Sequence, residues 1–437
     1  MSNGLILAAP SSSSGKTTVA LAITSALRRR GVCVVPAKSG PDYIDAAFLA
    51  AAAGAPCRTL DAWAMRRDTI AAMLHSCADA DLVLCEGAMG LFDGIGIDGA
   101  GSTASLAQLV GWPIVLVVDC AGAGASVSAL VEGFARHRPE TKLAGLILNR
   151  VGSARHQALL AASLARDLPE LPLLGALSRD PALALPSRHL GLVQAAEHVA
   201  LDGMLAHAAQ KAEAEIDLAR LLALASPASL ASRQGTAPLP PLGQRIAVAR
   251  DPAFAFAYEF VLDGWRGAGA SLSFFSPLAD EAPDRSCDAV YLPGGYPELH
   301  AGTLAAARRF RAGLCDAAAR NACIYGECGG YMTLGHGLID ADGARHEMAG
   351  LLPLETSFAE RRLHLGYRET RLIAASPLGD FGTRYRGHEF HYATIGDEGA
   401  GDPLFALADG EGSALHPAGR RIGSVMGSFV HLLDRAP

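Results

Sequence analysis

Short runs of consecutive apolar residues recur up to about residue 180 and alternate with Ala/Leu-rich segments. Continuous apolar runs fit strands that are buried on both faces of a parallel sheet, and the segments between them read as helices. The predicted strands are 4–9, 32–37, 82–85, 113–119, 144–149 and 172–176, and the predicted helices are 17–30, 102–111, 125–137 and 154–167. The pattern predicts a doubly wound α/β domain, whose ligands bind at the carboxyl ends of the strands.

A second α/β series follows a change in composition. Residues 194–224 predict one long amphipathic helix, and residues 226–244 are rich in Pro, Ser and Gly, as an interdomain linker would be. Further predicted strands lie at 245–249, 272–275, 289–293 and 323–326, with polar-alternating β segments after them. We therefore expect an N-terminal domain at 1–225, a linker at 226–244 and a C-terminal α/β domain at 245–437.

Composition narrows the function classes. The chain is 50% hydrophobic and 19% charged, which is typical of compact domains. A net charge of −7 without a basic run argues against a nucleic-acid partner. We find neither an apolar stretch of the roughly 18 residues that a membrane span needs nor a secretory signal. Nine cysteines without metal-type spacing favour reduced thiols, so we expect a cytoplasmic protein.

The first candidate site is a phosphate-binding loop between the first predicted strand and helix. The pattern requires glycine, four residues, then Gly-Lys-[Ser/Thr], and here only the first glycine is replaced, by Pro10. Backbone N–H groups at the helix start can hold phosphates, the lysine can bridge them and the threonine can bind Mg²⁺. An ordinary Ser-capped helix start is the structural alternative. The residues predicted to bind ATP here are Ser13, Ser14, Gly15, Lys16, Thr17 and Thr18.

Two acidic loops follow at predicted strand ends. The first reads Lys38-Ser-Gly-Pro-Asp42-Tyr43-Ile-Asp45, and the second reads Glu86-Gly-Ala-Met-Gly-Leu-Phe-Asp93-Gly. Strand ends of this fold converge on the nucleotide, so the four carboxylates predict a site for one or two Mg²⁺ ions near the γ-phosphate. Turn capping is the competing interpretation, because Pro-Asp and Asp-Gly are common in turns.

The second candidate site is a cysteine at a tight corner, in Tyr325-Gly-Glu-Cys328-Gly-Gly. The setting follows the logic of a nucleophile elbow, and a helix N-terminus there would lower the pKa of the thiol. His431, distant in sequence, is the candidate general base. A strand ending in Gly294-Gly295 would expose backbone N–H groups nearby. The alternative is one more buried thiol.

These motifs resemble a known family. The two acidic loops, together with Leu148-Asn149-Arg150-Val151 and the segment Pro186-Ser-Arg-His-Leu-Gly-Leu192, resemble the ATP-binding half of the cobyrinate and hydrogenobyrinate a,c-diamide synthases, a half similar to dethiobiotin synthetase. The cysteine and histidine motifs resemble the class I glutamine amidotransferase domain fused to such synthases. The resemblance covers essentially the whole chain. It implies amidation of the a and c carboxylates of hydrogenobyrinate or cobyrinate, through acyl phosphates and with ammonia from glutamine.

The resemblance also implies roles for individual residues. Asp45 and Glu86 would serve metal-assisted phosphoryl transfer, with Thr17 as a further Mg²⁺ ligand. Cys328 would form a glutamyl thioester, and His431 would shuttle protons. The remaining implied roles are ATP binding by Lys38 and Asn149, the latter at the adenine edge; substrate or metal positioning by Asp42, Tyr43 and Asp93; and an oxyanion hole from the N–H groups of Gly295 and Gly329. The implied small-molecule partners are a corrinoid, glutamine and ATP, with a homodimer as the assembly to consider.

Three questions stay open at this level. Many class I amidotransferases carry a glutamate two residues after the histidine, and here that position is Leu433. His388-Glu389-Phe390-His391 could orient His431 or contact the substrate at the domain interface, or it could be a strand with alternating exposed polar residues. The functional and the structural interpretation stand about equal. The alternative functions are a cobyrate synthase, which amidates other side chains, and a regulatory phosphate-loop ATPase with a degenerate amidotransferase domain.

Overall fold

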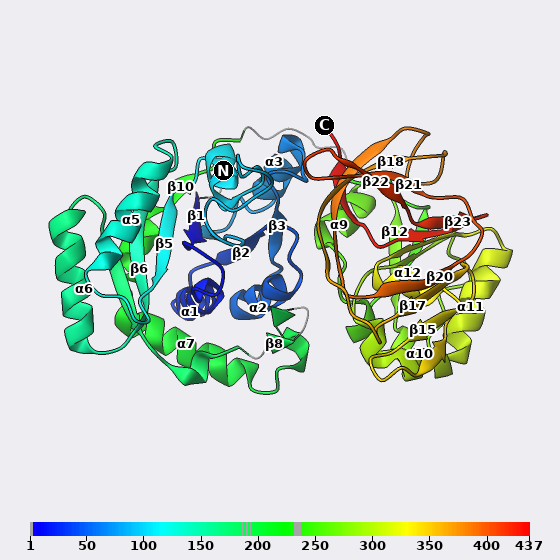
Figure 1. Ribbon diagram of the computed structural model, residues 1–437, viewed down its shortest axis with the longest axis horizontal. Helices are drawn as coiled ribbons and strands as arrows, with labels where there is room; N and C mark the ends of the chain where they lie inside the picture. Colours follow the sequence, from blue (N-terminus) through cyan, green and yellow to red (C-terminus); the bar gives the residue numbers. More distant parts are fainter. Residues whose placement is uncertain (1–2, 186, 189–190, 193, 231–236) are drawn as a thin grey trace. The chain divides into compact units, whose positions relative to one another are not determined.

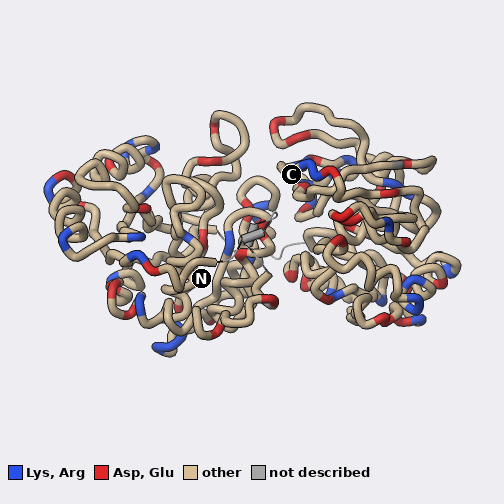
Figure 2. The backbone as a smooth tube through the Cα atoms, turned by 60° about the horizontal axis from the view of Figure 1, so that its bottom comes forward, with Lys and Arg blue, Asp and Glu red and all other residues tan. Residues whose placement is uncertain are grey.

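The computed structural model describes residues 3–185, 187–188, 191–192, 194–230 and 237–437. Its contacts divide the chain into two compact units, one formed by Met1–Trp63 and Ile70–Gly235 and the other by Ala64–Thr69 and Thr236–Pro437. Lys and Arg positions alternate with Asp and Glu positions along both units, without a long stretch of either sign (Figure 2). No helix in the described ranges is long and apolar enough to cross a membrane.

The N-terminal unit is built on a parallel sheet with strand order β3-β2-β4-β1-β5-β6-β7. The strands are β1 (Asn3–Ala8), β2 (Val34–Ser39), β3 (Arg58–Leu60), β4 (Leu82–Glu86), β5 (Ile114–Asp119), β6 (Leu143–Val151) and β7 (Leu173–Ser178). The chain winds outward from β1 in both directions, so right-handed crossovers place the connecting helices on both faces. The predicted doubly wound α/β fold is confirmed.

The helices of this unit form two layers. Helix α1 packs against both α2 and α7 on one side of the sheet, and α5 and α6 pack together on the other (Figure 1). The helices are α1 (Lys16–Arg29), α2 (Ile44–Ala53), α3 (Arg67–His75), α4 (Thr103–Val110), α5 (Ser126–His137), α6 (Ala154–Asp167), α7 (Leu201–Glu215) and α8 (Leu218–Leu224). The sequence patterns predicted all of the larger strands but missed α2, β3 and α3.

The single helix predicted over 194–224 is wrong. It is a short 3₁₀ turn followed by α7 and α8, which are separated at Ile216 and Asp217. Ile216 is extended and forms an isolated bridge with Gly175 of β7, and the side chain of Asp217 accepts a hydrogen bond from the N–H of Arg220 to start α8. A strand contact and a new N-cap therefore interrupt the helical pattern.

The first two residues of the predicted linker form a strand. Ser226–Pro227 forms β10, which pairs antiparallel with the start of β1. The division between the units falls between Gly235 and Thr236, within the 226–244 segment. Part of the family signature quoted above, Pro186, His189 and Leu190, lies outside the described residues, whereas β8 (Ser187–Arg188) and β9 (Gly191–Leu192) pair antiparallel.

The C-terminal unit contains a second, mostly parallel sheet with order β12-β11-β13-β14-β24-β23. An antiparallel five-stranded sheet, β22-β21-β18-β19-β25, contains the last strand of the chain. The strands of a four-stranded sheet, β16-β15-β17-β20, lie between residues 337 and 398. The bounds are β11 (Arg245–Ala249), β12 (Ser271–Phe275), β13 (Ala289–Leu292), β14 (Cys323–Glu327), β15 (Gly337–Ile339), β16 (Arg345–Glu347), β17 (Leu354–Ser357), β18 (His364–Leu372), β19 (Arg384–His391), β20 (Thr394–Glu398), β21 (Phe405–Asp409), β22 (Ala414–Ala418), β23 (Arg420–Ile422), β24 (Val425–Ser428), β25 (His431–Arg435), α9 (Glu259–Gly267), α10 (Ala301–Ala306), α11 (Arg308–Ala319) and α12 (Gly329–Leu334).

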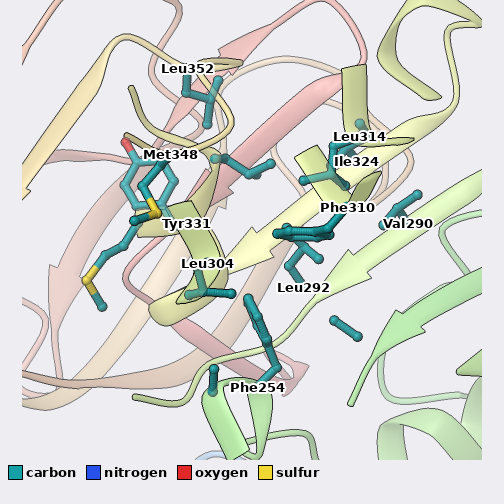
Figure 3. Close-up of a cluster of buried hydrophobic side chains, with 14 of the residues drawn as sticks. Phe254, Val290, Leu292, Leu304, Phe310, Leu314, Ile324, Tyr331, Met348 and Leu352 are labelled. Carbon is teal, nitrogen blue, oxygen red and sulfur yellow. The ribbon is translucent and has the colours of Figure 1, made fainter. Parts of the chain in front are cut away.

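A buried apolar cluster supports the cysteine corner. Figure 3 shows the ring of Phe310 close to Ile324 and Leu292, and the ring of Tyr331 beside Met348. Ile324 and Tyr331 flank Cys328 in sequence, and Cys328 itself belongs to the same cluster. Because closely packed side chains resist displacement, this cluster holds the turn that carries Cys328 in place.

Residues Ala64–Thr69 group with the C-terminal unit although they fall within the predicted N-terminal domain. Their anchor is Asp434 of β25, which is fully buried and accepts hydrogen bonds from the backbone N–H and Nε of Arg66, both at 2.9 Å, and from Thr69 Oγ1 at 2.5 Å. Asp434 lies three residues after His431 on the same strand.

We expect Arg66→Ala to destabilise β25 by about 3 kcal/mol, because it leaves a buried carboxylate without its cationic partner. Urea unfolding followed by hydrogen exchange of β25 peptides measures this. Arg67→Ala is the control, since Arg67 is exposed. Equal urea-unfolding midpoints for Arg66→Ala and Arg67→Ala would contradict the prediction.

Candidate functional site

The turn between β1 and α1 has the geometry of a phosphate-binding loop. Gly15 has φ +79°, and a Cβ there would lie 2.2 Å from Nδ2 of Asn149. That amide donates a hydrogen bond to the carbonyl of Ser14 at 2.9 Å, so β6 fixes the loop from the side. Only glycine fits this position. The role of Asn149 at an adenine edge stays a prediction.

Arg150 also holds the loop and was missed as a site residue. Its Nη1 donates to the carbonyl of Ser13 at 2.9 Å and contacts Asp119 Oδ2 at 2.7 Å. Its place directly after Asn149 at a strand end was the available signal. Thr18, the last predicted loop residue, lies in the first turn of α1.

Four predicted residues gather at the carboxyl ends of β2 and β4. Lys38 Nζ lies 2.7 Å from Asp45 Oδ2 and 3.2 Å from Glu86 Oε1. Thr17 Oγ1 donates to Glu86 Oε1 at 2.6 Å and lies 3.4 Å from Asp45 Oδ2. The side chains of Lys38 and Glu86 are almost wholly buried. The sequence-predicted group is therefore assembled in space.

Burial and mutual charge set the protonation of this group. Burial lowers the pKa of Lys38, but Glu86 and Asp45 outweigh it and hold that pKa well above its usual value. Burial raises the pKa of Glu86, whereas at Asp45 the charge of Lys38 overcomes burial and lowers the pKa. Burial likewise lowers the pKa of Lys16, whose Nζ donates to the carbonyl of Met89 at 3.1 Å.

The other two carboxylates act in turns. Asp42 Oδ1 accepts hydrogen bonds from the N–H groups of Ile44 and Asp45, at 2.9 and 3.0 Å, and its Oδ2 lies 3.8 Å from Lys38 Nζ. Burial, reinforced by the charge of Asp45, raises the pKa of Asp42 to about 7. Asp93 Oδ2 accepts from the N–H of Gly90 at 2.8 Å. Turn capping thus describes what both side chains do here. Their positioning roles, and that of Tyr43 just before α2, stay predictions.

Cys328 occupies a strained corner between β14 and α12. Its φ is +48° and its ψ is −106°, a conformation that non-glycine residues rarely adopt and that is typical of nucleophile elbows. Its N–H donates to the carbonyl of Ser428 at 2.8 Å, which ties the corner to β24. Burial raises the pKa of the thiol, contrary to the lowering expected from a helix N-terminus. The resting group is a thiol that needs a base.

His431, the first residue of β25, approaches this corner. A Cβ on Gly294 would lie 2.4 Å from His431 Cε1, 3.3 Å from its Nε2 and 3.3 Å from Cys328 Cβ. The Nε2–Cε1 edge of the ring and the cysteine therefore face the same point. Burial holds the pKa of His431 well below its usual value, so the imidazole is neutral and able to accept a proton.

Two backbone segments adjoin the cysteine. A Cβ on Gly329 would lie 3.0 Å from the nitrogen of Gly295, so the turn after β13 and the start of α12 are in direct contact. This closeness is compatible with the predicted oxyanion hole from Gly295 and Gly329, which stays a prediction.

The segment 388–391 is not an exposed polar strand. His388 and His391 are both buried. His388 stacks face to face on His431, with ring centroids 4.8 Å apart, and accepts or donates a hydrogen bond at Nε2 with Tyr258 Oη. Glu389 pairs with Arg368 Nε at 2.7 Å. His388 therefore contacts the ring of His431, whereas the carboxylate of Glu389 is engaged with Arg368.

Glu327 is the carboxylate that does lie near His431, and the sequence analysis missed it. Its Oε2 is 4.0 Å from His431 Nδ1. Burial raises the pKa of Glu327 to about 7. The signal was its position as the acidic residue of the elbow motif, directly before Cys328.

Two protein-family models match the chain, one in each unit. A model described as the CobQ/CobB/MinD/ParA nucleotide binding domain matches residues 5–193. One described as the CobB/CobQ-like glutamine amidotransferase domain matches residues 245–436.

Full-length relatives are also found. The hydrogenobyrinate a,c-diamide synthase of Rhizobium meliloti (strain 1021) is 55% identical over 435 residues, covering 99% of each chain. The enzyme of the same name from Sinorhizobium sp is 54% identical over 437 residues, again with 99% coverage of each. That of Rhodobacter capsulatus is 52% identical over 433 residues, with 98% coverage of each.

Proposed function

The chain belongs to the family of hydrogenobyrinate a,c-diamide synthases, and from this premise we propose that it amidates the a and c side-chain carboxylates of hydrogenobyrinate. The reaction uses ATP to activate each carboxylate and glutamine to supply ammonia. The observation that carries the proposal is that one chain holds both a phosphate loop beside an acidic cluster and a strained, buried cysteine beside a neutral histidine.

The N-terminal unit supplies activation. Loop N–H groups and Lys16 bind the phosphates of ATP, and the γ-phosphoryl group is transferred to a substrate carboxylate to give an acyl phosphate. Lys38, fixed as a cation between Asp45 and Glu86, stabilises the charge that develops on the transferred group. Ammonia then displaces phosphate and leaves the amide.

Magnesium fits the residues of this site. Glu86 Oε2 is buried and accepts no hydrogen bond from any described residue, and Thr17 and Asp45 add oxygen ligands beside it. Among the described residues no group of three or more His, Cys, Asp or Glu side chains could hold a metal alone. A Mg²⁺ ion held by two carboxylates, a hydroxyl and nucleotide phosphates matches how this ion is usually bound, and it would neutralise phosphate charge.

The C-terminal unit supplies ammonia. Cys328 Sγ attacks the side-chain carbonyl of glutamine while His431 takes its proton, and the same proton leaves with ammonia as the C–N bond breaks. Water then hydrolyses the thioester to glutamate. The nine cysteines are all free, so we assign the reaction to the reducing cytoplasm.

The direct test is an assay of the purified protein with Mg-ATP and glutamine, with the amide count of the product followed by mass. We expect two amides on hydrogenobyrinate, and slower or no turnover of cobyrinate. Products with more than two amides would favour a cobyrate synthase, and ATP hydrolysis without any amidation would favour a regulatory ATPase.

Gly294→Ala is expected to lower kcat/KM for glutamine by about 10²-fold, because its Cβ would displace the His431 ring. Amidation driven by ammonium salts should be retained. Gly267→Ala is the matched control, since a Cβ there meets nothing within 4 Å. Unchanged glutamine kinetics in Gly294→Ala would remove His431 from the corner.

A further inference from the structure

Glu327 is held by donors from three strands, β13, β14 and β25, of which β14 leads into Cys328 and β25 begins at His431. Tyr291 Oη donates to its Oε2 at 2.7 Å, and Tyr325 Oη donates to its Oε1 at 3.0 Å. The N–H of Leu432, the residue after His431, donates to Oε1 at 3.2 Å. The carboxylate is therefore fixed both to β14, which ends at the cysteine, and to β25, which begins at the histidine.

The bonding capacity of this carboxylate leaves an acceptor site on Oε2, the oxygen nearer the histidine. A carboxylate has about four lone-pair sites. Three are taken by the two tyrosines and Leu432, and His431 Nδ1 lies 4.0 Å from Oε2. The opposite edge of the imidazole faces the point shared with Cys328. Glu327 and Cys328 thus lie toward different nitrogens of one ring.

We propose that Glu327 is the positioning residue that orients His431 and stabilises its protonated form during glutamine hydrolysis. The inference rests on the proposed glutaminase reaction and adds a third member to it. The glutamate is contributed by the residue before the nucleophile rather than by the strand after the histidine, where Leu433 stands.

The proton balance explains the need for such a group. When Sγ bonds to the glutamine carbonyl carbon, the thiol proton passes to Nε2 and makes a buried imidazolium. Burial disfavours that cation, as the lowered pKa of His431 shows. A carboxylate near Nδ1 offsets the cost and keeps Nδ1–H as the resting tautomer, so that Nε2 is free of hydrogen. The proton then leaves with ammonia and Glu327 is unchanged.

The test compares Glu327→Gln with Glu327→Asp. Gln keeps the size and one acceptor oxygen but replaces the other oxygen by an NH₂ group and loses the charge, so we expect kcat for glutamine hydrolysis to fall by at least about 10²-fold with KM little changed. Asp keeps the charge and should restore part of the loss. Ammonia-driven amidation, measured on the same samples, should stay at the wild-type rate. The matched control is Glu355→Gln, whose carboxylate pairs with Arg345 in the separate four-stranded sheet.

Each outcome decides the matter. Glutamine hydrolysis by Glu327→Gln within about twofold of wild type would overturn the proposal and leave Cys328 and His431 as a dyad. A rise in KM with unchanged kcat, or no difference between Gln and Asp, would also overturn it, because both indicate a structural role. If the Glu327→Gln variant does not fold, Tyr291→Phe replaces it as the test, because it removes one donor to Oε2 of Glu327. This variant should also lower kcat for glutamine hydrolysis, and an unchanged kcat counts against the proposal. Absence of glutamine hydrolysis in the wild type would instead refute the proposed function.

Discussion

Cys328→Ala should reduce amidation driven by glutamine by about 10⁴-fold or more, because the variant lacks the thiol that forms the thioester. Cys328 is buried in the core of its unit, and alanine fills most of its space, so the fold should persist. The activation site lies at the ends of β1, β2 and β4 of the other unit. Amidation driven by ammonium salts should therefore stay within about twofold of wild type.

Cys323→Ala is the matched control for this variant. Cys323 starts the strand that Cys328 follows and is also buried, but its pKa, raised by burial to about 12, and its regular backbone give it no nucleophilic setting. The amidation rates of the Cys323→Ala variant should match those of wild type, with either glutamine or ammonium salts as the nitrogen source. Loss of the ammonia-driven reaction in a folded Cys328→Ala protein would contradict the assignment of carboxylate activation and ammonia release to two separate active sites.

The local features of both sites could be predicted because they depend on neighbours in sequence. Continuous apolar runs identified β1, β4, β5 and β6, and glycine next to Lys16 identified the loop. β3 and α2 were missed because β3 is very short and α2 is a brief Ala-rich helix without a strong polar face. The long helix over 194–224 was wrong because a contact with Gly175 in β7 interrupts it, which no local pattern records.

Long-range pairings were invisible for the same reason. The grouping of Ala64–Thr69 with the C-terminal unit depends on Asp434, more than 360 positions later in the chain. The proximity of Glu327 to His431 depends on the donation from Leu432, across a separation of 105 positions. Such contacts follow from tertiary packing rather than from spacing, so the sequence predicted the reacting residues but not the groups that hold them.

Glu86→Gln should block ATP-dependent amidation with either nitrogen source, by about 10³-fold, whereas glutamine hydrolysis should continue. The buried carboxylate accepts from Thr17 Oγ1 at 2.6 Å, lies 3.2 Å from Lys38 Nζ and keeps Oε2 unpartnered among the described side chains. Glutamine in place of Glu86 removes the negative charge that holds Lys38. Its NH₂ group also brings a hydrogen-bond donor close to the Lys38 cation or to a bound metal ion.

Glu132→Gln provides the comparison for that substitution, since Glu132 forms a solvent-exposed pair with Arg136 on α5. Nucleotide binding, measured by calorimetry with and without Mg²⁺, separates the roles of Glu86. If the carboxylate is a metal ligand, the Mg²⁺ dependence of ATP binding weakens in Glu86→Gln together with the rate. Normal turnover in this variant would remove Glu86 from phosphoryl transfer, and a lost rate with unchanged Mg²⁺ dependence would leave it as the residue that holds Lys38 in place.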